Sequence, residues 1–357
     1  METRARMIYL PDTMTNWPWP RIINPHFEAV KLEVDASFRD FKALSHESQE
    51  AFDKCDFARL AALLHPDVPR EHLRIGCDLM NIYFIVDEYT DIENAAVTKR
   101  MVDLIIDTLH NPHEIRPEGE CILGEIMRRF WARATQSASL PSQRRFLDSF
   151  IAYIRALVVE AFDRDQGHCR SINGYLKLRR DTCGVKSCFF VCEMGMDLPD
   201  EVFQHPVIAQ LEECIIELCL IDNDMASYNR EQATGDENHN LITAVMLELD
   251  LDVGGAMAWA ARYHAEVQTR FIDALTKIPS WGPSVDVLVK EYIDGIAIWV
   301  RGHHSWSYES QRYFGTMGTQ IQQTRLVPKL PKVNRKAASA EVNVVDLSMT
   351  YIMVQHE

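Results

Sequence analysis

Three carboxylates stand close together at Asp87, Glu88 and Asp91, directly after an apolar and aromatic run. If this segment is helical, Tyr83, Phe84 and Asp87 share one face, because residues three or four positions apart lie together on a helix. A carboxylate would then stand at the rim of an apolar wall. Mg²⁺ suits such a place, because it binds one or two carboxylates together with phosphate oxygens and water.

Two other interpretations of the same run remain open. The acids could form a helix end that faces solvent, which is the more common outcome for a single acidic cluster. Residues 81–87, with the sequence NIYFIVD, could also form a buried β-strand whose last residue lies at the carboxyl edge of a parallel sheet. This cluster alone therefore does not establish a metal site.

A second set of oxygen-bearing side chains recurs at every fourth residue, at Asn223, Ser227 and Glu231. Each step of four residues turns only about 40° around a helix of 3.6 residues per turn, so one stripe presents all three. An amide, a hydroxyl and a carboxylate form an all-oxygen set, which suits Mg²⁺ and is poor for zinc. A polar helix face in contact with water is the alternative.

Two cationic pairs lie beyond these clusters. Arg312 precedes Tyr313, and Arg179 precedes Arg180 shortly before an expected helix break at 182–184. A guanidinium can bind two phosphate oxygens at once, and a neighbouring phenol can donate one more hydrogen bond. Each pair alone is more often a surface ion pair. Together with the two oxygen clusters, however, they form the set that a metal-bound diphosphate needs.

The composition restricts the partners that the chain could have. Its 357 residues are 47% apolar and carry a formal net charge of −15. This size and apolar content fit one large globular unit that can enclose a cavity. The negative charge should repel nucleic acid and anionic lipid, so we expect neither as a partner. A diphosphate would have to be received through metal ions and local arginines.

The cysteines and the apolar runs indicate where the protein resides. The nine cysteines form no paired C-x-x-C blocks, so we expect free thiols in a reducing compartment and no structural zinc. The first residues contain no apolar run long enough for a signal peptide. No stretch approaches ~20 uninterrupted apolar residues, so we expect no membrane span and a cytoplasmic protein.

Hydrophobic periodicity predicts an all-α fold. Residues 142–162, 205–231 and 285–300 repeat apolar side chains at steps of three and four, and proline and glycine separate such segments. No Asn-Gly or Asp-Gly signal separates two alternating runs, so little β structure is expected. The pattern predicts about ten to twelve helices in one domain. Residues 328–357 have a basic, linker-like start and form a tail without an assigned role.

The three motifs, in this order, resemble those of basidiomycete-type class I sesquiterpene synthases, in the branch that includes Δ6-protoilludene synthases. The sequence DEYTD at 87–91 is similar to the aspartate-rich motif of that family. NDMASYNRE at 223–231 fits its N-D-x-x-S-x-x-x-E triad, and Arg312-Tyr313 matches its carboxyl-terminal Arg-Tyr pair. The resemblance covers roughly residues 8–327.

The resemblance implies a fold and a set of site residues. The fold would be a single class I terpene synthase-type helical bundle around a central apolar cavity, spanning 1–327, with residues 1–30 capping the site. The implied metal ligands, for the three Mg²⁺ ions that the family usually binds, are Asp87, Asp91, Asn223, Ser227 and Glu231. The implied diphosphate-binding residues are Arg179, Arg230, Arg312 and Tyr313, of which Arg179, Arg312 and Tyr313 are also the implied catalytic residues.

Two positions depart from the family pattern or add to it. Position 88 is Glu where many relatives carry Asp, so its share in metal binding is in doubt. Asp222 adds a charge beside the triad, and the sequence leaves open whether it faces the site. Aromatic side chains could stabilise a cation without reacting with it. The expected cavity wall is Tyr83, Phe84 and Trp299, with Phe189, Trp306 and Tyr308 as further candidates.

The implied activity is that of a terpene cyclase, a carbon–oxygen lyase acting on a diphosphate. It would ionise farnesyl diphosphate with Mg²⁺, close the cation into a sesquiterpene hydrocarbon and release diphosphate, as a monomer or a homodimer. The branch indicates Δ6-protoilludene, formed through 1,11-closure, with another sesquiterpene as the alternative. A prenyl diphosphate synthase is the nearest rival, but it usually has two aspartate-rich motifs. A non-catalytic helical binding module is the rival of a different class.

Overall fold

The computed structural model describes residues 7–333. Sixteen α-helices lie within this range, three of them single turns of four residues. The first eight are α1 (Phe27–Arg39), α2 (His46–Lys54), α3 (Phe57–Leu64), α4 (Arg70–Thr90), α5 (Ala95–His110), α6 (Ile122–Ala134), α7 (Leu140–Asp165) and α8 (Ile172–Thr182). The others are α9 (Val185–Cys188), α10 (Phe190–Glu193), α11 (Asp200–Phe203), α12 (Pro206–Thr234), α13 (Leu241–Leu249), α14 (Val253–Leu275), α15 (Pro283–Glu309) and α16 (Gly318–Thr324).

The all-α prediction is confirmed. The three periodic segments at 142–162, 205–231 and 285–300 lie in α7, α12 and α15. Residues 81–87 belong to α4, so the β-strand interpretation of that run is wrong. The short elements that remain are two 3₁₀ turns, η1 (Glu237–His239) and η2 (Gly315–Met317), and one pair of strands.

Local signals explain where the helices near the centre begin and end. The side chains of Ser139, Ser171 and Asp252 accept hydrogen bonds from backbone N–H groups in the first turns of α7, α8 and α14. Helix α12 starts with Pro206, whose missing N–H has no partner to lose there. It ends before Gly235, whose φ of 89° is a backbone conformation that residues with a side chain rarely adopt.

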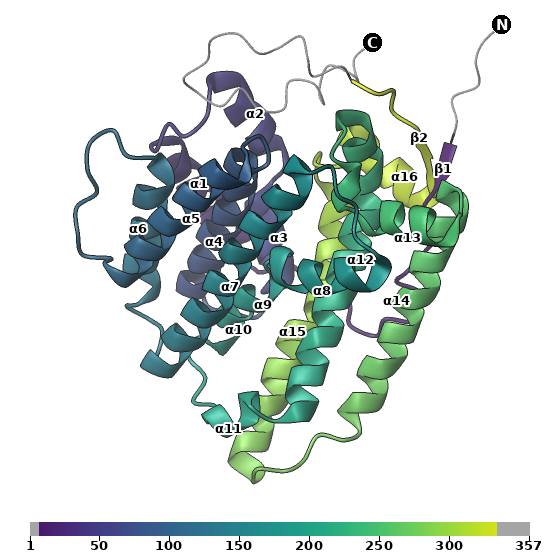
Figure 1. Ribbon diagram of the computed structural model, residues 1–357. Helices are drawn as coiled ribbons and strands as arrows, with labels where there is room; N and C mark the ends of the chain where they lie inside the picture. The colour runs from purple at the N-terminus through teal and green to yellow at the C-terminus, as the bar shows by residue number, and fades with distance from the viewer. Residues whose placement is uncertain (1–6, 334–357) are drawn as a thin grey trace, which may run out of the picture.

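The helices form two groups around a centre (Figure 1). Helices α1–α6 gather on one side and α12–α15 on the other, with α7, α8 and α9 between them. Helix α12 packs on α14 and α15, and α15 packs on α3, which in turn packs on α4. The central helices α4, α7, α8, α12 and α15 therefore surround the middle of the bundle. No helix within residues 7–333 combines the length and apolar character needed to cross a membrane.

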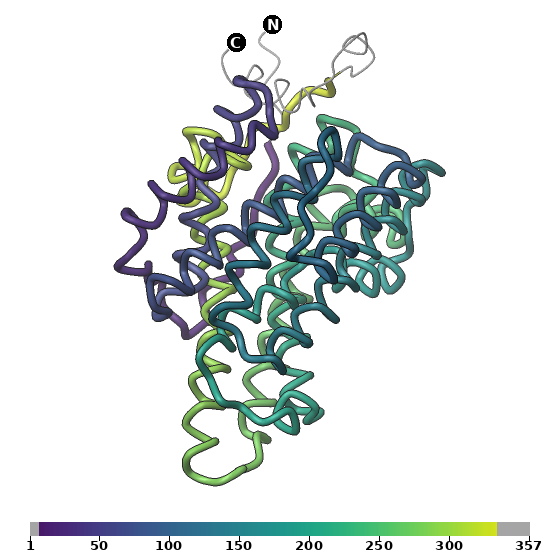
Figure 2. The backbone as a smooth tube through the Cα atoms, turned by 90° about the vertical axis from the view of Figure 1, so that its left-hand side faces the viewer, coloured from purple at the N-terminus to yellow at the C-terminus, as the bar shows by residue number. Residues whose placement is uncertain are grey.

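The amino-terminal segment lies along the outside of this bundle. Strand β1 (Met7–Tyr9) pairs antiparallel with β2 (Leu326–Pro328), so that Ile8 stands opposite Val327. Figure 2 shows the segment, in purple, descending from β1 beside α15. The Trp17 indole donates to the carbonyl of Ala297 on α15 at 3.1 Å. The termini of the described chain are thus joined to each other and to the bundle.

The described part of the tail binds the end of α12. Asn229 Nδ2 donates to the Pro328 carbonyl at 3.0 Å, and Gln232 Nε2 donates to the Leu330 carbonyl at 2.9 Å. The Val333 amide donates to a carbonyl of α12 at 2.8 Å. The boundary expected between residues 327 and 328 therefore falls inside β2. Residues 334–357, the rest of the expected tail, lie outside the described residues.

Helices α3 and α15 approach each other closely at Gly302, and a substitution there tests this packing. A Cβ atom at Gly302 of α15 would stand 2.6 Å from the Leu63 carbonyl oxygen of α3. Because backbone cannot move aside easily, Gly302→Ala should lower the free energy of unfolding by about 1–3 kcal/mol. Urea denaturation measures the change. The control Gly254→Ala, in the first turn of α14, meets nothing closer than 3.6 Å and should stabilise by less than about 1 kcal/mol. Equal effects of both substitutions would contradict this packing.

Candidate active site

One cavity of about 260 Å³ lies between α4, α7, α8, α12 and α15. Its size is near the lower end of the range for small-molecule pockets. One part of its wall is apolar and aromatic, and the other carries carboxylates, amides and guanidinium groups. The expected metal ligands, diphosphate-binding residues and principal cavity-wall residues all line it: Tyr83, Phe84, Asp87, Asp91, Arg179, Asn223, Ser227, Arg230, Glu231, Trp299, Arg312 and Tyr313. The structure therefore brings the separate sequence motifs to one place.

The amide of Asn223 connects three of the motifs. Its Oδ1 atom accepts a hydrogen bond from Arg179 Nη2 at 2.8 Å, and its Nδ2 atom donates to the Tyr313 hydroxyl at 2.7 Å. Arg179 also pairs with Asp224, at 3.3 Å from Nε to Oδ1. Side chains from α8, α12 and the segment after α15 thus contact one another directly.

The other two oxygen donors of α12 are held by a residue that the sequence did not indicate. Asn240 is fully buried, and its side chain also caps the start of α13. Its Nδ2 atom lies 2.8 Å from Glu231 Oε2 and 3.4 Å from Ser227 Oγ. Asn240 therefore fixes the direction of both side chains toward the cavity.

Helix α7 supports the carboxylates at the end of α4. The Tyr153 hydroxyl donates to Asp87 Oδ1 at 3.3 Å. Arg164 Nη2 donates to the Thr90 carbonyl at 2.7 Å and so fixes the last turn of α4, where Asp91 follows. The sequence motifs do not include these residues of α7. A signal for them exists, because Tyr153, Leu157, Glu160 and Arg164 follow one another along one face of α7 at steps of four, three and four.

Arg312 is held in place by Glu88, which does not line the cavity. Arg312 Nη1 lies 3.1 Å from Glu88 Oε1, and the guanidinium carbon lies 5.2 Å from the centre of the Phe84 ring. The Nε atom of Arg312 is buried and has no hydrogen-bond partner among residues 7–333. Glu88 thus positions the arginine, and one donor of that arginine remains free.

Asp222 faces away from the cavity. Its Oδ1 atom accepts a hydrogen bond from the Thr13 hydroxyl at 2.8 Å, and imidazole nitrogens of His264 and His304 lie 3.6 and 3.8 Å from its carboxylate. Although burial acts to raise it, the pKa of Asp222 is held well below its ordinary value by these two histidines. This carboxylate anchors the amino-terminal segment. None of the described residues 7–30 lines the cavity, so their capping role stays a prediction.

The aromatic candidates divide into two layers. Tyr83, Phe84 and Trp299 form part of the cavity wall, whereas Phe189 and Trp306 lie behind it. Phe189 contacts the edge of Trp299 at 5.6 Å between ring centres, and Trp306 stands 5.7 Å from Phe84. Tyr308, the remaining candidate, also lies outside the lining.

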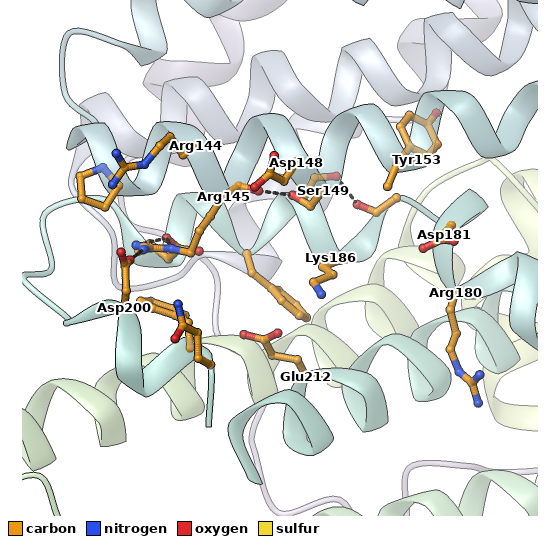
Figure 3. A pocket seen from close by; sticks show the side chains of 18 of the residues that line it. Arg144, Arg145, Asp148, Ser149, Tyr153, Arg180, Asp181, Lys186, Asp200 and Glu212 are labelled. Atoms are coloured by element: carbon orange, nitrogen blue, oxygen red, sulfur yellow. Dashed lines mark hydrogen bonds and ion pairs between the residues drawn. The ribbon is translucent and has the colours of Figure 1, made fainter. Parts of the chain in front are cut away.

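A second hollow of about 510 Å³ lies on the other side of α9 (Figure 3). Exposed charged side chains, among them Arg144, Asp148 and Lys186, stand around it. Arg145 pairs there with both Glu193 and Asp200. Charged groups in contact with water make this hollow unsuitable for an apolar substrate, so we assign the candidate site to the smaller cavity.

Comparison with known proteins agrees with this geometry. Residues 78–270 match the family described as "Terpene synthase family 2, C-terminal metal binding". "Sesquiterpene synthase 14" of Postia placenta is 52% identical over 351 residues, which cover 97% of this chain and 100% of that protein. The chain belongs to the terpene synthase family.

Two further similarities concern another relative from the same organism and the fold of this terpene synthase. "Delta(6)-protoilludene synthase 18" of Postia placenta is 50% identical to it, over 98% of this chain and 100% of that protein. The crystal structure of "a-eudesmol synthase" superimposes with a TM-score of 0.76, at 19% identity, over 84% of this chain and 100% of that chain. The predicted family and the predicted helical fold are both confirmed.

The cavity of this terpene synthase fits the divalent metal that its metal-binding domain implies. The donor atoms at the candidate ligand positions are all oxygens, the type that Mg²⁺ prefers. Among residues 7–333, no three His, Cys, Asp or Glu side chains converge on a point where they could hold an ion alone. Mg²⁺ binds through a few carboxylates and completes its shell with substrate phosphates and water rather than a protein cage.

The carboxyl groups at the rim of the cavity are buried close together, so their ionisation requires positive charge nearby. Burial, and secondarily the neighbouring Asp91, raises the pKa of Asp87 to about 7. Burial likewise raises the pKa of Glu160, which lines the same cavity, to about 7. A cation that enters the cavity stabilises the ionised form of these carboxyl groups.

The raised pKa of Asp87 predicts how stability depends on pH without metal. Because the folded-state pKa exceeds the ordinary value of 3.8, its contribution to stability is present below about pH 4 and is lost as the pH rises toward 7. Asp87→Asn should therefore raise the melting temperature at pH 7.5 by about 1–3 °C in EDTA. Differential scanning fluorimetry measures it. The exposed control Glu114→Gln should not change the melting temperature, and a lower value for Asp87→Asn would contradict the argument.

Proposed function

We propose that this terpene synthase is a sesquiterpene cyclase that converts farnesyl diphosphate into a cyclic hydrocarbon and releases diphosphate. One observation carries the proposal: a single cavity joins two oxygen-donor clusters and several arginines to an apolar, aromatic wall. The polar part suits a metal-bound diphosphate, and the apolar part suits a prenyl chain. The names of its relatives, at up to 52% identity over nearly the whole chain, support this substrate class.

The residues proposed to hold the metal are Asp87 and Asp91 on one side and Asn223, Ser227 and Glu231 on the other. Three Mg²⁺ ions, the number that the family resemblance implies, are part of the proposal. When bound, magnesium acts as a Lewis acid on the diphosphate oxygens and neutralises charge as the carbon–oxygen bond breaks. Tyr153 and Asn240 orient the protein ligands through the hydrogen bonds described above.

The residues proposed to bind the departing diphosphate are Arg179, Arg230, Arg312 and Tyr313. Negative charge grows on the leaving group as it separates, so these donors stabilise the transition state more than the bound substrate. Arg312 is prepared for this role, because Glu88 occupies one end of its guanidinium and its Nε has no hydrogen-bond partner in the part of the chain that the structure describes. Arg179 and Tyr313 reach the same point through their shared contact with Asn223.

The apolar wall would protect the carbocation that remains. Water reacts with such a cation, so the wall must exclude it during cyclisation. The faces of Tyr83, Phe84 and Trp299 can stabilise positive charge by about 0.5–2 kcal/mol each without reacting. Folding of the prenyl chain against this wall would decide which carbons join.

The proposal also covers the cellular compartment and the oligomeric state of the protein. All nine cysteines are free and most are buried, which suits a reducing compartment such as the cytoplasm. The protein would act there as a monomer or a homodimer.

The decisive experiment is incubation of the purified protein and Mg²⁺ with geranyl, farnesyl and geranylgeranyl diphosphates, followed by analysis of the volatiles. Farnesyl diphosphate should give cyclic C15 hydrocarbons. A longer prenyl diphosphate, formed on addition of isopentenyl diphosphate, would indicate a chain-elongating enzyme instead. Absence of turnover, together with no thermal shift on addition of Mg²⁺ and pyrophosphate, would favour a binding module.

Removal of one proposed ligand from either cluster should stop the reaction. Asp87→Ala and Asn223→Ala should each lower turnover of farnesyl diphosphate by at least about 100-fold, because the leaving group loses a stabilising contact. Both variants should also lose most of the thermal shift that Mg²⁺ with pyrophosphate causes in the wild type. Asn111→Ala, on the surface after α5, is the matched control and should behave as wild type. Near wild-type rates for both ligand variants, at limiting Mg²⁺, would refute the assignment.

The proposed product is Δ6-protoilludene, formed by 1,11-closure through a humulyl cation. The support for it is similarity to relatives with that name, at 50% identity for one of them. Gas chromatography with mass spectrometry should show Δ6-protoilludene as the main hydrocarbon from farnesyl diphosphate. A main product with a 1,10-closed or acyclic skeleton would remove this product and leave the cyclase assignment intact.

A further inference from the structure

One imidazole inside the cavity is unaccounted for by the steps above. His303 lies on α15, one helical turn after Trp299, and lines the cavity. Its Nδ1 atom is buried and has no hydrogen-bond partner among residues 7–333. An unpaired polar atom in an apolar wall costs free energy, so a chemical role would explain why this side chain is retained.

The surroundings keep this imidazole neutral. Burial lowers the pKa of His303 to about 4, and the charges of Arg179 and His304 act in the same direction, while that of Asp222 opposes them. At neutral pH the ring therefore keeps a free lone pair. His303 lines the cavity, and no donor among residues 7–333 binds its Nδ1 atom.

The other basic or acidic groups that line the cavity are engaged elsewhere. His239 lies at the rim, where its Nε2 atom is 3.1 Å from Glu160, and His168 of the same lining is exposed to solvent. Of the other lining carboxylates, Asp163 pairs with Arg170 and Asp236 accepts a hydrogen bond from Thr234, and the rest are the proposed metal ligands. Tyr83 shares a hydrogen bond with Ser187, and burial raises the pKa of its phenol well above the ordinary value. Burial also raises the pKa of the Cys188 thiol, so it stays protonated. Among the described residues, His303 is thus the basic side chain in the apolar part of the cavity wall that is available to accept a proton.

We propose that His303 is the base that ends the cyclisation by taking a proton from the final carbocation. This role rests on the proposed function. The imidazole lone pair forms an N–H bond, and the electrons of the broken C–H bond become the double bond beside the cationic carbon. The charge passes to the imidazolium, which returns its proton to water after the product leaves. No oxidant or further reactant is needed.

The position of His303 along α15 suits this step. At a rise of about 1.5 Å per residue, it lies about 6 Å from Trp299 along the helix axis. Arg312, which would hold the diphosphate, comes nine residues later, beyond the end of α15 at Glu309. The base would therefore act on the hydrocarbon within the aromatic wall, away from the departing diphosphate.

His303→Phe tests the proposal, because it keeps a ring of similar shape and removes the basic nitrogens. Diphosphate release should continue, since the groups that would hold the leaving group remain. The share of released diphosphate that ends as the wild-type main hydrocarbon should fall by at least about tenfold, in favour of products with other double-bond positions or added water. An unchanged product ratio would overturn the proposal. His304→Gln is the matched control, because the neighbouring imidazole faces Asp222 outside the cavity, and its product ratio should not change.

Chemical rescue separates a base from a mere shape-filling ring. His303→Ala leaves a space of imidazole size, and imidazole added to the assay should restore the wild-type product ratio. Pyrazole has nearly the same size and is a much weaker base, so it should restore little. Equal rescue by both, or by neither, would overturn the proposal and assign the side chain to shaping the wall. If the wild type itself releases no diphosphate from any prenyl substrate, the proposed function has failed rather than the role of His303.

Discussion

One amide group holds the polar end of the cavity together. Asn223 accepts a hydrogen bond from Arg179 and donates one to Tyr313, so α8, α12 and the segment after α15 meet at a single side chain. The amide makes both contacts because it carries an acceptor oxygen for the guanidinium and a donor nitrogen for the phenol. The groups proposed to hold the metal and the diphosphate thus share one support, and a change in the tilt of α12 would separate them.

The same helix is fixed from its opposite side. Ser227 and Glu231 face the cavity, where Asn240 holds them, while Asn229 and Gln232 bind the backbone that follows β2. The last turns of α12 are therefore held between the cavity and the paired termini of the described chain. Rigid support of this kind is what precise placement of ligand atoms requires. It also gives residues 328–333 a structural role that composition alone did not indicate.

The parts of this architecture that the sequence predicted are those encoded locally. The stripe of Asn223, Ser227 and Glu231 follows from spacing within one helix, and periodicity was sufficient to predict α7, α12 and α15. The supports of the site depend on contacts between distant segments. Asn240 stands in a loop between helices, and no periodicity shows that its side chain turns back onto α12. The direction of Asp222 and the path of residues 7–30 likewise depend on which neighbour each one meets.

The cavity reconciles two requirements that oppose each other. A reactive cation needs a dry, apolar wall, yet ionisation needs dense charge at its rim. In this structure the polar side chains near the rim hydrogen-bond to one another, whereas the His303 Nδ1 atom in the wall has no hydrogen-bond partner within residues 7–333. A hydrogen bond to His303 would stabilise the fold by about 1 kcal/mol but would occupy a nitrogen that a proton could otherwise reach. Stability and reactivity therefore make opposite demands on the His303 nitrogen. The fold leaves that nitrogen without a hydrogen bond among the described residues and keeps the hydrogen bonds between the polar side chains at the rim.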